Sequence, residues 1–275
     1  MPYSLLNTVI ILIHGTWGTS SDWHQPGGLF HDMLQMQAEK KGATVVPFCW
    51  SGANDPKARS TAAQALVQLI KSYPSDMPLY VIGHSHGGNV ATLASRLLPK
   101  HAPKHRIHSL YLLGTPARAV DYGPNMDVIT YLYNLVSFQD FIQPVIGIFD
   151  RAQPTHPRIA NMSISINDKE PGHSDMHHYS IGLWLLYLDQ QMYEKESEGF
   201  VNFTFEKAGV LQFFNHEEPR YTIDPEWETK IKEDKRLQER LVDTILRNTL
   251  KTTHSLAMDL YPESRPLLGC DQVIR

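Results

Sequence analysis

Ser85 stands in a turn that can present a nucleophilic hydroxyl. The segment Gly83-His84-Ser85-His86-Gly87-Gly88 follows the apolar run 79–82 and opens a stretch with helical spacing. A G-x-S-x-G turn between a strand and a helix holds the serine in strained geometry above a sheet, and its glycines avoid Cβ collisions. The N–H groups at the start of the helix then face the negative charge that develops on a carbonyl oxygen. The pattern therefore predicts Ser85 as a nucleophile in acyl chemistry.

A second glycine-rich bend, His14-Gly15-Thr16-Trp17-Gly18, follows the first apolar run of the chain. An oxyanion hole needs backbone N–H groups that are already aimed at the developing charge, and such a bend can supply one of them. We expect Thr16 N–H and His86 N–H to form the pair, with Trp17 N–H as the alternative to the first. The competing interpretation is an ordinary tight turn in which His14 caps the strand.

These two motifs, together with Leu113-Gly114-Thr115-Pro116, make residues 5–190 resemble the lipase and esterase branch of the α/β-hydrolase superfamily. The resemblance implies hydrolysis of carboxylic esters through an acyl-enzyme intermediate, with a Ser-Asp-His triad and no cofactor. It also implies the chain order serine, acid, histidine.

The acid of the triad is predicted to be Asp140. It lies just beyond the strand-like run 128–137, and the resemblance places the acid in this loop, where an apolar residue and a proline often follow. Asp121 and Asp150 are the alternatives. The competing interpretation of Asp140 itself is a carboxylate that only caps the loop.

The histidine is expected after the strand-like run 162–166. The resemblance favours His173, because the histidine of the family often follows a glycine and precedes a helix, and Ser174 can cap such a helix. His177 is the alternative. His173, Asp175, His177 and His178 also permit a zinc site, since imidazole and carboxylate are ordinary zinc ligands. No cysteine supports that site, so the prediction is no metal and no cofactor.

Large aromatic side chains surround the predicted site. We expect Trp17, Trp23 and Phe141 to contact substrate, with Phe138 and Ile142 beside them, or else to be ordinary core. The segment between Pro116 and the strand at Val128 is too short for a cap domain. A small lid could come from 141–156 or from the C-terminal segment.

Runs of strand-like residues alternate with runs of helical spacing, which favours a parallel sheet covered on both faces. The prediction is an α/β-hydrolase fold, with a mostly parallel central sheet, helices on both faces and no large cap domain. The expected strands are Thr8–Ile13, Ala43–Trp50, Leu79–Ile82, Leu110–Leu113, Val128–Val136 and Met162–Ile166.

The character of the sequence changes near residue 196. We predict a catalytic core over 1–195 and a C-terminal extension over 196–275 that packs on it. The extension would hold a hairpin from Phe200–Phe205 and Val210–Phe214, then a long helix that begins at Asp224-Pro225.

The 25 basic and 29 acidic residues give a net charge of −4, which argues against a nucleic-acid partner. Cys49 and Cys270 alone predict no disulfide framework.

The N-terminus lacks the basic region of a secretory signal, and no apolar run reaches the length of a membrane span. The expected location is cytoplasmic, and peripheral membrane contact or non-classical export is compatible with it. The sequence does not indicate an oligomeric state.

The predicted function is therefore cleavage of carboxylic esters or thioesters, with small-molecule or lipid esters as substrates and a role in lipid metabolism. Acyl transfer or amide cleavage on the same triad is the first alternative. A non-catalytic interaction protein that keeps the fold is the second, because one fold supports many functions.

Overall fold

The computed structural model describes residues 8–40, 42–140, 151–166, 169–191, 200–205, 210–213 and 220–222. The strands within these ranges are β1 (Thr8–Ile13), β2 (Ala43–Phe48), β3 (Leu79–His84), β4 (Ile107–Leu113), β5 (Ile129–Val136), β6 (Ile159–Ile166), β7 (Phe200–Phe205), β8 (Val210–Phe213) and β9 (Arg220–Thr222). The helices are α1 (Leu29–Lys40), α2 (Pro56–Lys71), α3 (His86–His101), α4 (Ala119–Tyr122) and α6 (Tyr179–Gln191), with 3₁₀ turns η1 (Gly18–Ser20) and η2 (His173–His177).

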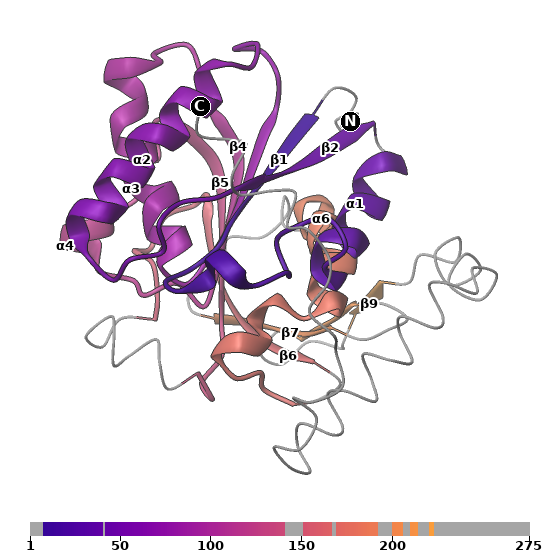
Figure 1. Cartoon of the computed structure of the whole chain (residues 1–275). Helices are drawn as coiled ribbons and strands as arrows, with labels where there is room; N and C mark the ends of the chain where they lie inside the picture. Colours follow the sequence, from indigo (N-terminus) through magenta and orange to yellow (C-terminus); the bar gives the residue numbers. More distant parts are fainter. Residues whose placement is uncertain are drawn as a thin grey trace.

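One twisted sheet runs through the molecule in the order β2-β1-β3-β4-β5-β6-β7-β8-β9 (Figure 1). Every pair from β2 to β7 is parallel, whereas β8 and β9 are antiparallel to their neighbours. This arrangement confirms the predicted, mostly parallel sheet. Because the strands are parallel, the loops that follow β1, β3, β4, β5 and β6 all leave from the same edge of the sheet.

The two faces of the sheet are both apolar, as strand β1 illustrates. Ile10 and Leu12 belong to one hydrophobic cluster, while Val9, Ile11 and Ile13 belong to the other. Side chains alternate between the faces of a strand, so an uninterrupted apolar run is what a strand covered on both sides requires.

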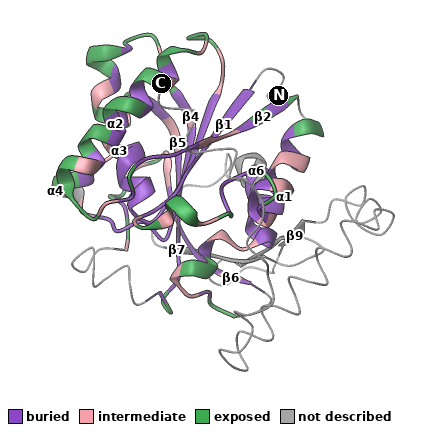
Figure 2. Cartoon of the chain, viewed as in Figure 1, coloured by how far each residue is buried: buried purple, intermediate pink, exposed green. Residues whose placement is uncertain are grey.

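Two pairs of helices cover these faces. α1 and α6 pack together on one face, and α2 and α3 pack together on the other (Figure 1). Gly182 of α6 allows a close approach, because a Cβ there would lie 2.7 Å from the backbone oxygen of Phe30 on α1. Figure 2 shows β1, β4 and β5 largely buried and the outer sides of α2 and α3 exposed. The predicted helices on both faces are confirmed.

Between β4 and β5 the chain forms only the short helix α4, in keeping with the absence of a cap domain at this point. Of the lid suggested over 141–156, residues 141–150 lie outside the described residues, so the lid stays a prediction. Of the helices that the structure describes, none is long and apolar enough to cross a membrane.

The predicted hairpin is present as the antiparallel pair β7 and β8, and β7 also pairs with β6, so the hairpin continues the central sheet. The long helix expected from Asp224 lies outside the described residues. The division of the chain at residue 195 stays a prediction.

Candidate active site

Ser85 occupies the sharp turn between β3 and α3. Its backbone angles are φ 53° and ψ −131°, and its amide donates to the carbonyl oxygen of Leu113 over 2.9 Å. Among the described residues, Ser85 and Trp17 are the two non-glycine residues with positive φ. Such conformations cost on the order of 1–3 kcal/mol and persist only where surrounding structure holds them, often at functional sites.

The glycines around Ser85 are required by close packing of the turn. A Cβ on Gly83 would lie 2.6 Å from the Cα of Gly88, and a Cβ on Gly87 would lie 2.5 Å from the carbonyl oxygens of Ile13 and His14. The collisions that the sequence motif implied are therefore real contacts with β1 and with the start of α3. They fix the height of the Ser85 hydroxyl above the sheet.

The structure brings Ser85, His173 and Asp140 together in one line of hydrogen bonds. Nε2 of His173 lies 2.9 Å from the Ser85 hydroxyl oxygen, and Nδ1 lies 2.7 Å from Oδ2 of Asp140. Asp140 is completely buried, and the His173 side chain is nearly so. With Nδ1–H donating to the carboxylate, Nε2 of the neutral imidazole is left to accept a hydrogen bond from the Ser85 hydroxyl.

Gly114 packs directly against the carboxylate of Asp140. Its φ is +55°, and a Cβ there would lie 3.0 Å from Oδ2 of Asp140 and 3.5 Å from Nδ1 of His173. The bend after β4 thus has to be glycine for two reasons: the backbone is left-handed, and the space is already taken by the carboxylate.

His84, which sequence reasoning did not single out, holds the backbone of His173 in place. The ring of His84 is buried, and its Nε2–H donates to the backbone carbonyl of His173 over 3.0 Å. Burial, followed by the nearby His177 and His173, holds the pKa of His84 well below its usual value. His84 is therefore a neutral donor, because a charged ring would be costly there.

The alternative residues are placed elsewhere. Asp121 lies on α4, half exposed, and pairs with Arg118 at 3.2 Å, while Asp150 lies outside the described residues. The ring of His177 stacks on Trp23 with centroids 5.0 Å apart. Nδ1 of His178 accepts from the backbone amide of Ser180 over 3.2 Å.

The loop histidines consequently face different partners. Burial lowers the pKa of His178 to about 4, and Asp175 is exposed. The side chains of the suggested zinc cluster do not form a group that could hold an ion in the described part of the chain.

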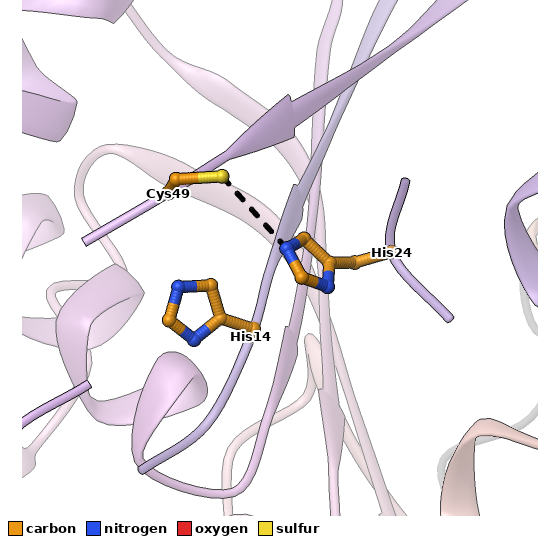
Figure 3. A group of neighbouring side chains, drawn as sticks. All are labelled: His14, His24 and Cys49. Atoms are coloured by element: carbon orange, nitrogen blue, oxygen red, sulfur yellow. Dashed lines mark hydrogen bonds between the residues drawn. The ribbon is translucent and has the colours of Figure 1, made fainter. Parts of the chain in front are cut away.

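A different group of potential ligands does converge, where the loop after β1 meets the end of β2. Atoms of His14, His24 and Cys49 lie within 4.8 Å of one another and are buried (Figure 3). His14, however, uses both ring nitrogens: Nδ1 lies 2.8 Å from the carbonyl oxygen of Gly15, and Nε2 accepts from the amide of Trp50. Cys49 is disulfide-bonded, which the cysteine spacing did not predict. The group therefore shapes the loop and does not fit a metal ion.

The loop after β1, which is predicted to supply an oxyanion donor, packs on Ser85, since a Cβ on Gly15 would lie 2.8 Å from the Cβ of Ser85. The amide of Trp17 donates to the carbonyl oxygen of Gly52 over 2.8 Å, so the alternative donor is already engaged. No acceptor in the described part of the chain contacts the amide of Thr16. His86 is the first residue of α3, where a backbone N–H has no partner within the helix.

The aromatic residues expected at the site have different environments. The side chain of Trp17 is 75% exposed, and that of Phe138 is 45% exposed beneath the guanidinium of Arg151. Trp23 is buried and packs edge-on against Phe30 in the core. Phe141 and Ile142 lie outside the described residues. Trp23 thus supports the histidine loop from within the protein.

Comparison with known proteins decides the family. Residues 10–168 match the model of the Alpha/beta hydrolase family. The chain belongs to this family. No curated protein matches the sequence significantly.

Three solved structures illustrate the likeness of this α/β hydrolase to others. An extracellular alpha/beta-hydrolase from a Paenibacillus species is 24% identical, with a TM-score of 0.29, over 40% of this chain and 42% of that one. A cutinase-like protein from Cryptococcus sp. is 14% identical, with a TM-score of 0.31, over 40% and 54%. Mouse alpha/beta hydrolase domain-containing protein 10 is 14% identical, with a TM-score of 0.45, over 67% and 89%. This chain therefore spans about half or less of the first two relatives.

Proposed function

We propose that this α/β hydrolase cleaves carboxylic esters or thioesters, including lipid or acyl esters, with Ser85 as nucleophile, His173 as general base and Asp140 as the orienting acid. The observation that carries the proposal is the hydrogen-bonded line from the Ser85 hydroxyl through His173 to Asp140, with distances of 2.9 and 2.7 Å. A nucleophile, a base within hydrogen-bond reach and a third group that orients the base are the elements that acyl transfer to serine requires.

In the first half of the reaction the Ser85 oxygen attacks the carbonyl carbon while Nε2 of His173 takes the hydroxyl proton. His173 then protonates the leaving alcohol or thiol as the bond to the carbonyl carbon breaks, which leaves an acyl-Ser85 ester. In the second half, water attacks that ester, gives its proton to His173 and releases the acid. Asp140 holds the imidazole in its tautomer and stabilises the imidazolium, without itself becoming protonated.

Two backbone amides would receive the negative charge of the tetrahedral intermediate. His86 N–H at the start of α3 is one candidate, and Thr16 N–H is the other, because the amide of Trp17 is bonded to Gly52. Removal of one such donor typically costs about 10²–10³-fold in turnover.

The first test is labelling with a fluorophosphonate, followed by a p-nitrophenyl ester series of increasing acyl chain length. Ser85→Ala should abolish labelling and lower turnover by about 10⁶-fold, because the nucleophile is gone while the oxyanion donors remain. Ser72→Ala is the matched control, since that exposed hydroxyl bonds to the carbonyl oxygen of Leu69 at the end of α2. Labelling that persists in Ser85→Ala would refute the proposal.

A further inference from the structure

Arg59 is a buried cation without an anionic partner. The residue lies in the first turn of α2 and is only 6% exposed. Its Nε–H donates to the hydroxyl of Tyr122 over 2.9 Å, and Nη1–H donates to Oδ1 of Asn54 over 3.2 Å. Both acceptors are neutral. The remaining N–H groups of the guanidinium, including those on Nη2, have no acceptor in the described part of the chain.

Two carboxylates that neighbour Asn54 and Tyr122 in the chain are used elsewhere. Asp55 caps α2 by accepting from the amide of Ala58 over 2.9 Å, and Asp121 pairs with Arg118. Arginine is almost never buried unless it is paired, because an uncompensated charge loses its hydration. An arginine held in this position by neutral groups therefore lacks the counter-charge that would balance it.

Arg59 lies in the first turn of α2, and His86, the residue after Ser85, begins α3, which packs against α2. Burial, followed by the positive charge of Arg59 and then by His173, lowers the pKa of His86 to about 4. The positive charges of Arg59 and of a protonated His173 thus both act on this imidazole.

His86 and Tyr122 offer further hydrogen-bond donors. His86 is 3% exposed; its Nδ1 accepts from Nδ2 of Asn89 over 3.0 Å, so the proton of the neutral ring lies on Nε2, which is buried without a partner. The hydroxyl of Tyr122 accepts from Arg59 and keeps its own hydrogen for donation. A guanidinium, a hydroxyl and an imidazole N–H without acceptors are the groups that bind an oxyanion.

We propose that Arg59, with Tyr122 and His86 beside it, binds an oxyanion carried by the ester substrate, so that the enzyme prefers acyl groups that end in a carboxylate or bear a phosphate. This inference rests on the proposed ester hydrolysis and defines its substrate class. The planar guanidinium can bind either oxyanion through two parallel hydrogen bonds.

The test compares substrates that differ only in charge. They are the p-nitrophenyl monoesters of succinic, glutaric and adipic acid, each beside its methyl-capped counterpart. The measured quantity is the ratio of kcat/KM for the acid to that for the capped ester. The wild-type ratio should exceed one most strongly at the chain length that reaches Arg59. A ratio of one or less at every length would overturn a carboxylate subsite.

Arg59→Gln should lower this ratio by about 10- to 100-fold, chiefly through KM, because a hydrogen bond to a charged group is lost in ground state and transition state alike. Tyr122→Phe keeps the packing and should lower the ratio by a smaller factor. Tyr122→Phe is also the variant that tests the inference if Arg59→Gln does not fold. Arg96→Gln is the matched control, because Arg96 is exposed on α3 and donates to the backbone of Asp121. An unchanged ratio in Arg59→Gln and Tyr122→Phe would overturn the inference.

A binding experiment separates this inference from the proposed catalysis. Glutarate and inorganic phosphate are titrated by calorimetry into the Ser85→Ala chain and into Ser85→Ala with Tyr122→Phe or Arg59→Gln. Binding that weakens in the double variants supports the subsite even if no ester is hydrolysed. Glutarate binding identifies a carboxylate, and binding of phosphate alone identifies a phosphate. Absence of binding by both anions would overturn the subsite whatever the esterase assay gives.

Discussion

Nε2 of His84 lies 3.0 Å from the backbone oxygen of His173, so the residue before Ser85 holds the residue that faces the Ser85 hydroxyl. The contact joins β3 to the loop after β6, across 89 positions of the sequence. The ring of His84 also packs against that of His173, with centroids 4.8 Å apart. The turn that presents Ser85 and the loop that presents His173 are therefore fixed to each other by one side chain.

His84→Phe should keep the volume of the ring but remove its donor. We expect the unpaired carbonyl of His173 to lower the free energy of unfolding by about 1–3 kcal/mol. We also expect kcat on a p-nitrophenyl ester to fall by about tenfold, since a modest misplacement of the base is costly.

His84→Gln, which can still donate, should recover part of both losses. A thermal midpoint that falls with no change in kcat or in its pH profile would show that His84 has only a structural role.

Asp140→Asn should lower kcat by about 10³–10⁴-fold, because the amide favours the wrong tautomer of His173. Asp121→Asn is the control, since that carboxylate pairs with Arg118. Steady-state kinetics of the two variants shows which of the two carboxylates acts as the acid. If Asp121→Asn caused the large loss and Asp140→Asn a mild one, the acid would be the residue on α4.

Gly114→Ala should damage both stability and catalysis. Its φ of +55° strains any side chain by about 1–2 kcal/mol, and the new Cβ would press on the carboxylate of Asp140. Gly27→Ala is the matched control: it also has a positive φ, +93°, but a Cβ there would meet nothing within 4 Å.

Denaturant unfolding and esterase kinetics should therefore show a stability loss in both variants and a fall in kcat only in Gly114→Ala. Equal kcat values would mean that the contact with Asp140 has no effect on the acid.

Acid should destabilise the fold through its buried histidines. Burial, followed by His14, His177 and His31, lowers the pKa of His24 to about 3. The unfolded chain takes up this proton near pH 6.5, whereas the folded chain does so only near pH 3. The stabilisation is thus complete above pH 6.5 and is lost as the pH falls toward 3.

Each such histidine contributes a slope of about 1.4 kcal/mol per pH unit in this window. His24→Gln should reduce the slope of unfolding free energy between pH 4 and pH 6 by about that amount, while above pH 7.5 the two slopes should coincide. Urea unfolding at several pH values measures both. An unchanged slope in the acid window would mean that His24 is protonated in the folded protein.

The sequence by itself determined the local parts of this protein. The strands, the turn at Ser85 and the bend after β1 follow from residues adjacent in the chain, since apolar runs, glycines and helix starts act within a few positions. The hairpin of β7 and β8 could also be predicted from the sequence, although the pairing of β7 with β6 could not. The parallel sheet was predictable because strands alternated with helices.

Only the tertiary structure decided which side chains meet. Asp140 and Asp121 both follow strands, and His173 and His177 share one loop, so spacing alone left each pair open. Parallel pairing of β3 with β4, β4 with β5 and β5 with β6 sets which loop ends face Ser85. His173 and Asp140 meet there, although they lie 88 positions and 55 positions from Ser85 in the chain. Arg59 belongs to none of the sequence motifs. Its lack of a counter-charge becomes visible only in the fold, where Arg59 is buried and its side-chain hydrogen bonds go to Asn54 and Tyr122.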